Sequence, residues 1–376
     1  MAVKKRLIVV GDGASGLMLA NKTRMLTNNN DVEIVLIGNN RTHFLKEDGA
    51  QIAVGLKNYK SSIKDSEFLV NFGISYIHDE VIRIDAANKS VSVKSGKAYD
   101  YDFLVLALGG KIFPEGLPGY VGEAKHFHDL QHALELKEYI DQFKGGNIVI
   151  GNISQSKMNP YLTYELAFLL SELITNKKLG GVTKFHFISP KGDYAAVDSL
   201  DARLKSLGYE IHSDFDISGI SSKNREIQST DGKAIRYDLL VLSPPSSPEE
   251  VLVASGLVGE NGLVSVDKSK LSLKGYRDVY AIGECNDAPV LKCIGSSLYQ
   301  AGYLAKMLAH KMSGAYYESN YDGSSISSIL VGNGKSITVF SNYAKPPVVS
   351  EGSFTDHILN MTSTETYFSA AIRGVF

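Results

Sequence analysis

The sequence contains no tryptophan and only two cysteines, Cys285 and Cys293, among its 376 residues. Two thiols cannot build a disulfide scaffold, which favours a reducing, cytoplasmic compartment. No apolar run approaches the ~20 residues needed to cross a bilayer. The opening residues, MAVKKR, lead directly into an apolar strand and leave no room for a signal peptide. We therefore expect a cytoplasmic protein that meets a membrane, if at all, at its cytoplasmic face.

An excess of charge of either sign is also missing, because 39 Lys and Arg residues balance 41 Asp and Glu residues. The formal net charge of −2 argues against a nucleic-acid partner, which would favour a strongly basic surface. The hydrophobic share of 44% is that of an ordinary soluble globular protein. A chain of this length exceeds one ordinary core, so we expect two or three domains.

A glycine loop of the form G-x-G-x-x-G follows the apolar strand at residues 7–10 and precedes a helix-like run. Gly11 makes the tight turn, Gly13 lets the backbone approach a pyrophosphate, and Gly16 lets the helix pack closely on the strand. The helix N-terminus offers free N–H groups to the phosphate. The strand–turn–helix context makes this a strong signal for a dinucleotide site.

The second apolar strand, residues 32–37, ends where an Asp or Glu usually binds a ribose hydroxyl. The residue at that place is Gly38, followed by Asn39. Asn39 can hydrogen-bond a ribose hydroxyl instead, or it can be a plain turn residue, and both interpretations stay open.

The pattern G-K-A-x-x-Y-D occurs twice, at residues 96–102 and 232–238, each time before an apolar strand. Alternating segments at 81–93 and 217–227 precede the two copies and are typical of small antiparallel meanders. A repeat of this period predicts two α/β nucleotide-binding units, each with a meander and a return strand. A third apolar strand, near residue 280, ends in Gly283 and Glu284.

These pieces together resemble the two-dinucleotide-binding-domain FAD oxidoreductases, a group that includes disulfide reductases, type II NADH dehydrogenases and sulfide:quinone oxidoreductases. The resemblance covers roughly residues 5–340 and implies an enzyme with FAD as its cofactor. The family has Thr at Leu108 and Asp at Glu284, so those two positions depart from its pattern. The residues that the resemblance places against FAD, together with the candidate ribose residue, are Gly11, Gly13, Ala14, Ser15, Gly16, Asn39, Ala107, Leu108, Gly109, Gly283 and Glu284.

Within that family the sequence is most similar to the sulfide:quinone oxidoreductase branch, in segments 164–167, 290–292, 321–323 and 332–335. That branch uses two redox cysteines beside the flavin. Their positions fall here at Met158 or Asn159 and at Ser327, and none of these is a cysteine. The persulfide mechanism of the branch therefore cannot be carried over to this chain.

Lys292 and Cys293 are the candidate catalytic residues. Lys292 can place positive charge near the reduced flavin, or it can be a surface lysine. A neighbouring lysine and a helix N-terminus would lower the pKa of the Cys293 thiol. The alternative is that Cys293, and more strongly Cys285, are buried and inert.

A second glycine loop is expected after the strand at 146–150, but Ile153 and Ser156 occupy its second and third glycine positions. Side chains there would block the close approach of a phosphate. The strand at 184–188 also ends without a carboxylate. Conventional NADH binding is therefore not expected, although residues 154–157 offer an alternative set of anion-binding groups.

Two further patterns have competing explanations. His128 and His132 are spaced for a metal pair, but no third ligand is in view, and a helix entry capped by Asp129 explains the stretch better. An apolar helical face near the C-terminus can bind a membrane interface or pack on the protein's own body. Its residues are Tyr367, Phe368, Ala371, Ile372, Val375 and Phe376.

We predict an α/β fold with two Rossmann-like FAD/NAD(P)-type domains, their β-meanders and a small C-terminal domain. The FAD-binding domain is expected at 1–111 and 246–312, the second unit at 112–245 and the C-terminal domain at 313–376. The expected function is electron transfer from a small-molecule donor through FAD toward a quinone. The alternatives are an NAD(P)H-dependent flavin oxidoreductase with an unconventional nicotinamide site and a non-catalytic FAD-binding protein. Self-association into a homo-oligomer stays open.

Overall fold

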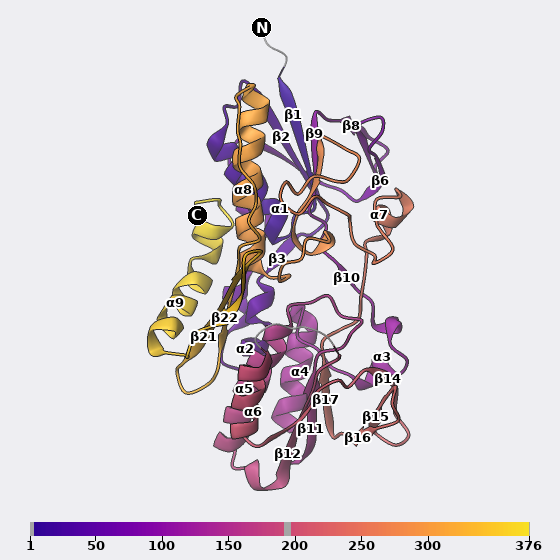
Figure 1. Cartoon of the computed structure of the whole chain (residues 1–376), viewed down its shortest axis with the longest axis vertical. Coiled ribbons are helices and arrows are strands. Elements are labelled where there is room, and N and C mark those ends of the chain that lie inside the picture. The colour runs from indigo at the N-terminus through magenta and orange to yellow at the C-terminus, as the bar shows by residue number, and fades with distance from the viewer. Residues whose placement is uncertain (1–3, 192–196, 376) are drawn as a thin grey trace.

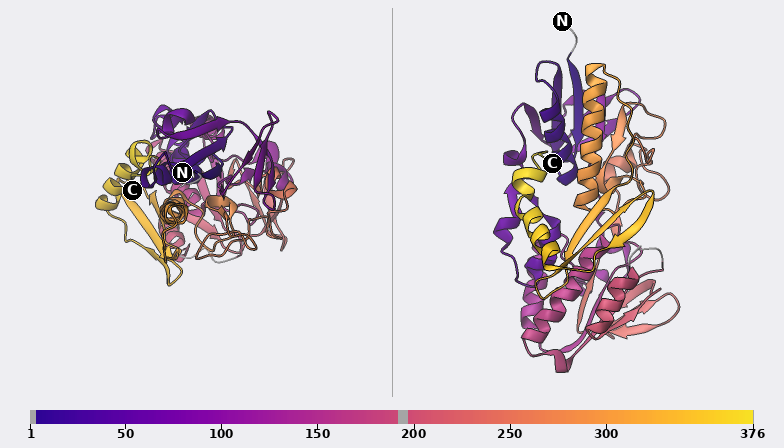
Figure 2. Two further views of the ribbon diagram at one scale, coloured as in Figure 1. Left: turned by 90° about the horizontal axis from the view of Figure 1, so that it is seen from above. Right: turned by 60° about the vertical axis from the view of Figure 1, so that its left-hand side comes forward.

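The computed structural model describes residues 4–191 and 197–375. The molecule is elongated, with two α/β lobes stacked end to end and the C-terminal segment along one side (Figures 1 and 2). The first strand of the chain begins at the far end of the first lobe, away from the second lobe.

The first lobe is built on a five-stranded parallel sheet. Its strands are near-continuous apolar runs, as expected for parallel strands that are buried on both faces. In order across the sheet they are β19 (Val279–Ala281), β9 (Phe103–Leu106), β1 (Lys5–Val10), β2 (Val32–Gly38) and β5 (Ile74–His78).

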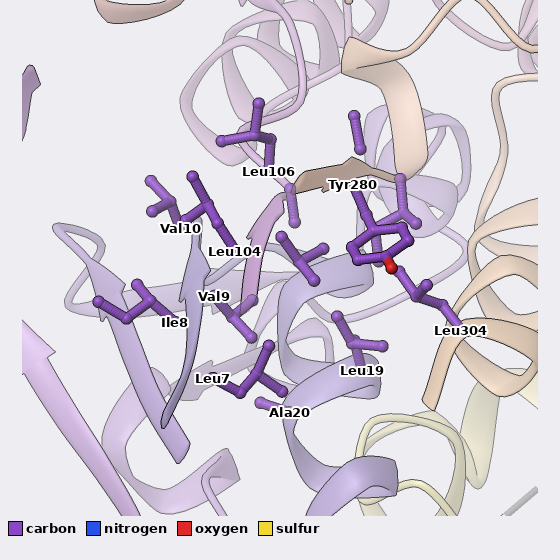
Figure 3. Close-up of a cluster of buried hydrophobic side chains, with 14 of the residues drawn as sticks. Leu7, Ile8, Val9, Val10, Leu19, Ala20, Leu104, Leu106, Tyr280 and Leu304 are labelled. Atoms are coloured by element: carbon purple, nitrogen blue, oxygen red, sulfur yellow. The ribbon is translucent and has the colours of Figure 1, made fainter. Parts of the chain in front are cut away.

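Two helices, α1 (Ala14–Leu26) and α8 (Ile294–Ser313), pack against each other on this sheet. Figure 3 shows Leu7 and Val9 of β1 gathered with Leu19 of α1 and Leu304 of α8, all of them fully buried. Elsewhere in the lobe lies a meander of β6 (Val81–Asp85), β7 (Ser90–Val93) and β8 (Ala98–Asp100).

The second lobe repeats the plan with a four-stranded parallel sheet and a three-stranded meander. The sheet consists of β13 (Tyr209–His212), β12 (Thr183–Ile188), β11 (Gly146–Gly151) and β17 (Leu239–Leu242). The meander consists of β14 (Ile217–Ser221), β15 (Glu226–Ser229) and β16 (Ala234–Arg236). The helices are α4 (Leu130–Gln142), α5 (Pro160–Asn176) and α6 (Val197–Ser206). The predicted fold class, with two Rossmann-like units and their meanders, is confirmed.

The chain passes between the lobes through β10 (Lys111–Ile112) and β18 (Ser246–Ser247), which pair antiparallel. From the first lobe, α2 (Gly49–Ala53) packs against α4 and α5 of the second. The remaining short elements are β3 (Thr42–Phe44), β4 (Ile63–Asp65), α3 (Tyr120–Glu123) and α7 (Glu250–Ala254). The residue limits of the three domains stay a prediction.

The C-terminal segment forms a three-stranded antiparallel sheet and a helix. They are β20 (Ser325–Leu330), β21 (Ser336–Asn342), β22 (Lys345–Val349) and α9 (Phe354–Glu365). β20 packs on both α5 and α8 and so links the lobes. After α9, a π-helical turn at Tyr367–Ala371 buries Tyr367, and Ile372 beyond it is buried too, so most of the apolar face predicted there packs on the protein's own body. Phe376 lies outside the described residues.

Candidate functional site

The glycine loop at the end of β1 has the geometry that its sequence predicts. Gly11 has a φ of +110°, and a Cβ on it would lie 2.3 Å from the carbonyl oxygen of Ala107. A Cβ on Gly16 would lie 1.8 Å from the carbonyl oxygen of Gly11. Both close approaches require glycine, because any side chain would push α1 away from the sheet.

Gly13 is the N-cap of α1, and no described side chain caps that helix. A Cβ on Gly13 would meet no described atom within 4 Å. The first N–H groups of α1 therefore face open space with no partner of their own, which is the arrangement that binds phosphate at a helix start. This cradle fits the pyrophosphate of a dinucleotide cofactor.

A cavity of about 550 Å³ extends from this cradle toward the N-terminus of α8. Three of the predicted residues, Gly11, Gly16 and Gly283, do not line it. Gly283 instead allows close packing, because a Cβ there would lie 2.3 Å from the Ser15 hydroxyl oxygen. The predicted residues that do line the cavity are Gly13, Ala14, Ser15, Asn39, Ala107, Leu108, Gly109, Glu284, Lys292 and Cys293. Their individual roles in binding stay predictions.

Lys292 lies in the wall of this cavity rather than out in solvent. Its ammonium donates hydrogen bonds to the carbonyl oxygens of Asn286 (2.8 Å) and Ala288 (3.0 Å) and to Oδ1 of Asn286 (3.1 Å). Burial lowers the pKa of Lys292 to about 8. The three acceptors hold the charge in one place, and near pH 8 that charge becomes titratable.

The two cysteines are both free thiols that are buried in the protein. Burial raises the pKa of Cys285 and of Cys293 to about 11. The Cys293 sulfur accepts a hydrogen bond from the backbone N–H of Ser296 and so caps α8. At neutral pH both groups are thiols rather than nucleophilic thiolates, which favours the structural interpretation of Cys293.

Sequence reasoning did not assign the polar side chains of His128 and Glu47 to the cavity wall. His128 is buried, and neither of its ring nitrogens has a hydrogen-bond partner in the described part of the chain. Glu47 accepts a hydrogen bond from the backbone N–H of Ile294 at the start of α8 (3.2 Å), and burial raises its pKa to about 7. The sequence placed His128 in a possible metal pair and Glu47 in no motif, so what assigns both to this wall is their proximity in space.

The positions that the resemblance assigns to the two redox cysteines are brought together. The side-chain amide of Asn159 donates to the hydroxyl oxygen of Ser327 at 3.2 Å, and both side chains are buried. Of the two candidates left open at the first position, Asn159 makes this contact, while Met158 lines the cavity beside it. An amide–hydroxyl hydrogen bond therefore occupies the place of a redox pair.

A second cavity, of about 760 Å³, lies next to the first. It is formed by residues of the loop 154–161, the segment 289–292 and the hairpin of β21 and β22. Met158 and Lys292 line both cavities, so the two adjoin at these residues.

Two matched Rossmann-like lobes, with an uncapped glycine loop in the first, define the class of two-lobed dinucleotide-binding flavoproteins. Residues 5–307 match the family model described as pyridine nucleotide-disulphide oxidoreductase, and the chain belongs to this family. It is an FAD-dependent oxidoreductase.

The chain is 24% identical over 335 residues to the mitochondrial sulfide:quinone oxidoreductase of Dictyostelium discoideum, covering 85% of this chain and 73% of that one. It is 29% identical over 139 residues to the type II NADH:quinone oxidoreductase of Staphylococcus haemolyticus, covering 37% and 34%. The crystal structure of the sulfide:quinone oxidoreductase from Aquifex aeolicus superposes with a TM-score of 0.86 at 17% identity, covering 98% of this chain and 92% of that one. This superposition shows the shared fold.

Proposed function

We propose that this protein passes electrons from a small-molecule donor through FAD to a quinone-type acceptor, without a cysteine persulfide. Bound FAD supplies the two-electron chemistry, and the protein orients it. The names of the relatives support the acceptor, since both the sulfide and the NADH enzymes among them are quinone oxidoreductases.

The hydrogen bond between Asn159 and Ser327 is the observation that supports electron transfer without a cysteine persulfide. Neither an amide nor a hydroxyl can form a disulfide or hold a sulfur atom as a persulfide. The two thiols that do exist are buried and protonated. A donor must therefore reduce the flavin directly rather than through a protein sulfur.

The second cavity supports a quinone-type acceptor. Much of its lining is apolar, and it adjoins the cofactor cavity at Met158 and Lys292. Flat, largely apolar ligands are typical of such pockets. The apolar lining residues are Met158, Pro160, Tyr161, Leu263, Pro289, Val290, Leu291, Val339, Tyr343, Ala344, Pro346 and Pro347.

An NAD(P)H-dependent flavin oxidoreductase is the second candidate, because Ser154 and Lys157 line the same cavity and can bind an anion. Anaerobic stopped-flow absorbance separates the two functions. Sulfide, NADH and NADPH are each mixed with the oxidised protein, and a soluble quinone is mixed with protein that one equivalent of dithionite has reduced. We expect the quinone to reoxidise the flavin rapidly.

Fast flavin bleaching by micromolar NADH or NADPH would establish the second candidate instead. If the reduced flavin stayed bleached in the presence of quinone, the proposed acceptor would be wrong. If no donor bleached it either, a non-catalytic FAD-binding protein would be the better description.

We also propose that α9, rather than the turn after it, makes any membrane contact. Phe354, Ile358, Leu359 and Met361 fall on one face of α9 and are between 48% and 65% exposed. In the described part of the chain no helix is long and apolar enough to span a bilayer. Liposome flotation of an Ile358→Glu/Leu359→Glu variant should show loss of vesicle binding, and equal flotation of both proteins would contradict the assignment.

A further inference from the structure

Asp12, the residue between the first two glycines of the loop, has a buried carboxylate at the end of β2. Its Oδ2 accepts hydrogen bonds from the backbone N–H of Asn40 (3.0 Å) and from the hydroxyl of Tyr76 (2.8 Å). Its Oδ1 accepts one hydrogen bond, from the side-chain amide of Asn40 (2.6 Å). The side chain is thus fixed at the junction of the glycine loop and two strands, in the wall of the cofactor cavity.

The position of this carboxylate accounts for Gly38. A Cβ on Gly38 would lie 2.1 Å from the carboxylate carbon of Asp12. A side chain at residue 38 would therefore collide with Asp12, and the two carboxylates could not both be present. A carboxylate from the glycine loop therefore lies beside the strand end at which the usual carboxylate is missing.

We propose that Asp12 binds the adenosine ribose of FAD in place of the missing strand-end carboxylate, and so makes the protein sensitive to the ribose hydroxyls. Oδ1 has only one donor and keeps the capacity to accept another hydrogen bond. Asn40 and Tyr76 orient the carboxylate, and Gly38 and Asn39 line the same wall of the cavity. Asn39, the residue that sequence reasoning assigned to the ribose, then has a lesser role.

A purely structural role for Asp12 is the competing explanation, since its three hydrogen bonds tie the loop to β2 and β5. Removing a ribose hydroxyl from the ligand separates the structural role of Asp12 from a role in ribose binding. A structural defect weakens FAD and its deoxyribose analogues equally, whereas loss of a ribose contact weakens FAD alone.

The test measures binding of FAD and of analogues that carry 2′-deoxy- or 3′-deoxyadenosine to the flavin-free protein, by quenching of flavin fluorescence. The wild-type protein should bind one of the analogues about 10- to 100-fold more weakly than FAD, as expected for a hydrogen bond to a charged group. In Asp12→Asn this ratio should fall to within about 3-fold of unity, because the charged acceptor is gone. A wild-type protein that binds all three ligands equally would overturn the proposal, and so would an unchanged ratio in Asp12→Asn.

Two comparison variants sharpen the result. Asp201→Asn removes a similar buried carboxylate, which accepts from the Tyr164 hydroxyl at 2.8 Å in the second lobe, and should leave the ratio as in the wild type. A swap variant, Asp12→Gly/Gly38→Glu, returns the carboxylate to the strand end. Glycine is needed at 12, because the Asp12 Cβ itself would lie 2.5 Å from a Cβ at residue 38. A restored ratio in the folded swap variant supports the proposal, and a ratio near unity counts against it.

Discussion

The two lobes each place a loop between a buried parallel strand and a helix, but the two helices begin in opposite ways. In the first lobe, α1 starts directly after Gly13 and its first N–H groups are uncapped. In the second lobe, α5 starts only at Pro160, and the side chain of Asn159 accepts from the N–H of Tyr161 at 3.1 Å. Proline has no N–H to offer, so the helix start of α5 has little left with which to bind a phosphate.

This difference adds a second physical reason to the one that the sequence suggested for the second loop. Ile153, which was expected to block the close approach of a phosphate, is buried in the hydrophobic cluster of the second lobe. Because α5 is already capped, its start has fewer free N–H groups for a phosphate. The same Asn159 also donates to Ser327, so one residue caps α5 and occupies a position that the resemblance assigns to a redox cysteine.

The largest effect on FAD binding is expected at Gly13, where the start of α1 is uncapped and open. Gly13→Leu places a side chain in space that no described atom occupies, so the protein should fold but lose FAD binding by at least ~100-fold. A comparison change in the second loop, Ser154→Leu at the exposed residue next to the position that matches Gly13, should leave FAD binding within about 3-fold of the wild type. Bound flavin measured after gel filtration, with circular dichroism as the folding control, checks both. Equal flavin content in the two variants would remove the distinction between the loops.

The next largest expected effect is a gain of flavin reduction by sulfide. Asn159→Cys/Ser327→Cys puts two thiols where two side chains already meet, so a disulfide should form in air. Sulfide should then bleach the flavin of the double variant much faster than that of either single variant. Thiol titration of the denatured protein reports the bridge, and stopped-flow absorbance reports the bleaching. A bridged variant that sulfide still fails to reduce would show that the donor site differs in more than its cysteines.

Lys292 lines both cavities, so replacing it tests a residue that the two sites have in common. If the Lys292 charge stabilises the reduced, anionic flavin as predicted, Lys292→Met should lower the reduction potential by roughly 30–60 mV, or ~1.4–2.8 kcal/mol. Burial lowers the Lys292 pKa to about 8, so the charge is present below that pH and is lost above it. The difference in potential between wild type and variant should therefore shrink as the pH rises through about 8. Lys345→Met, at the rim of the second cavity, is the control, and an unchanged potential in Lys292→Met would end the assignment.

The first loop was predictable from the sequence because backbone contacts at Gly11 and Gly16 tolerate no Cβ, and this requirement leaves a spaced glycine pattern that can be recognised. The matched lobes were predictable from the repeated pattern. The cavity positions of His128 and Glu47 were not, because what marks them is that both His128 ring nitrogens and Oε2 of Glu47 have no partner in the described part of the chain, inside a cavity that distant segments build. Asp12 was hidden for another reason: the glycine pattern treats its position as variable, and only the folded strands show that its carboxylate fills the space at Gly38.

The smallest effect is expected from removing the Asn159 cap, which tests whether capping alone keeps the second loop from binding a phosphate as the first loop does. Asn159→Ala removes the cap of α5 and leaves Ser327 without its donor, which should lower the free energy of unfolding by about 1–3 kcal/mol. Asn159→Asp keeps an acceptor for the Tyr161 N–H and should recover most of that loss, which separates the cap from the Ser327 contact. Urea unfolding measures both. NADH titration of Asn159→Ala should still show no tight binding, because Pro160 provides no N–H at the first turn of α5. Tight NADH binding by this variant would mean that a single cap, rather than the whole start of the helix, keeps the second loop from holding a phosphate.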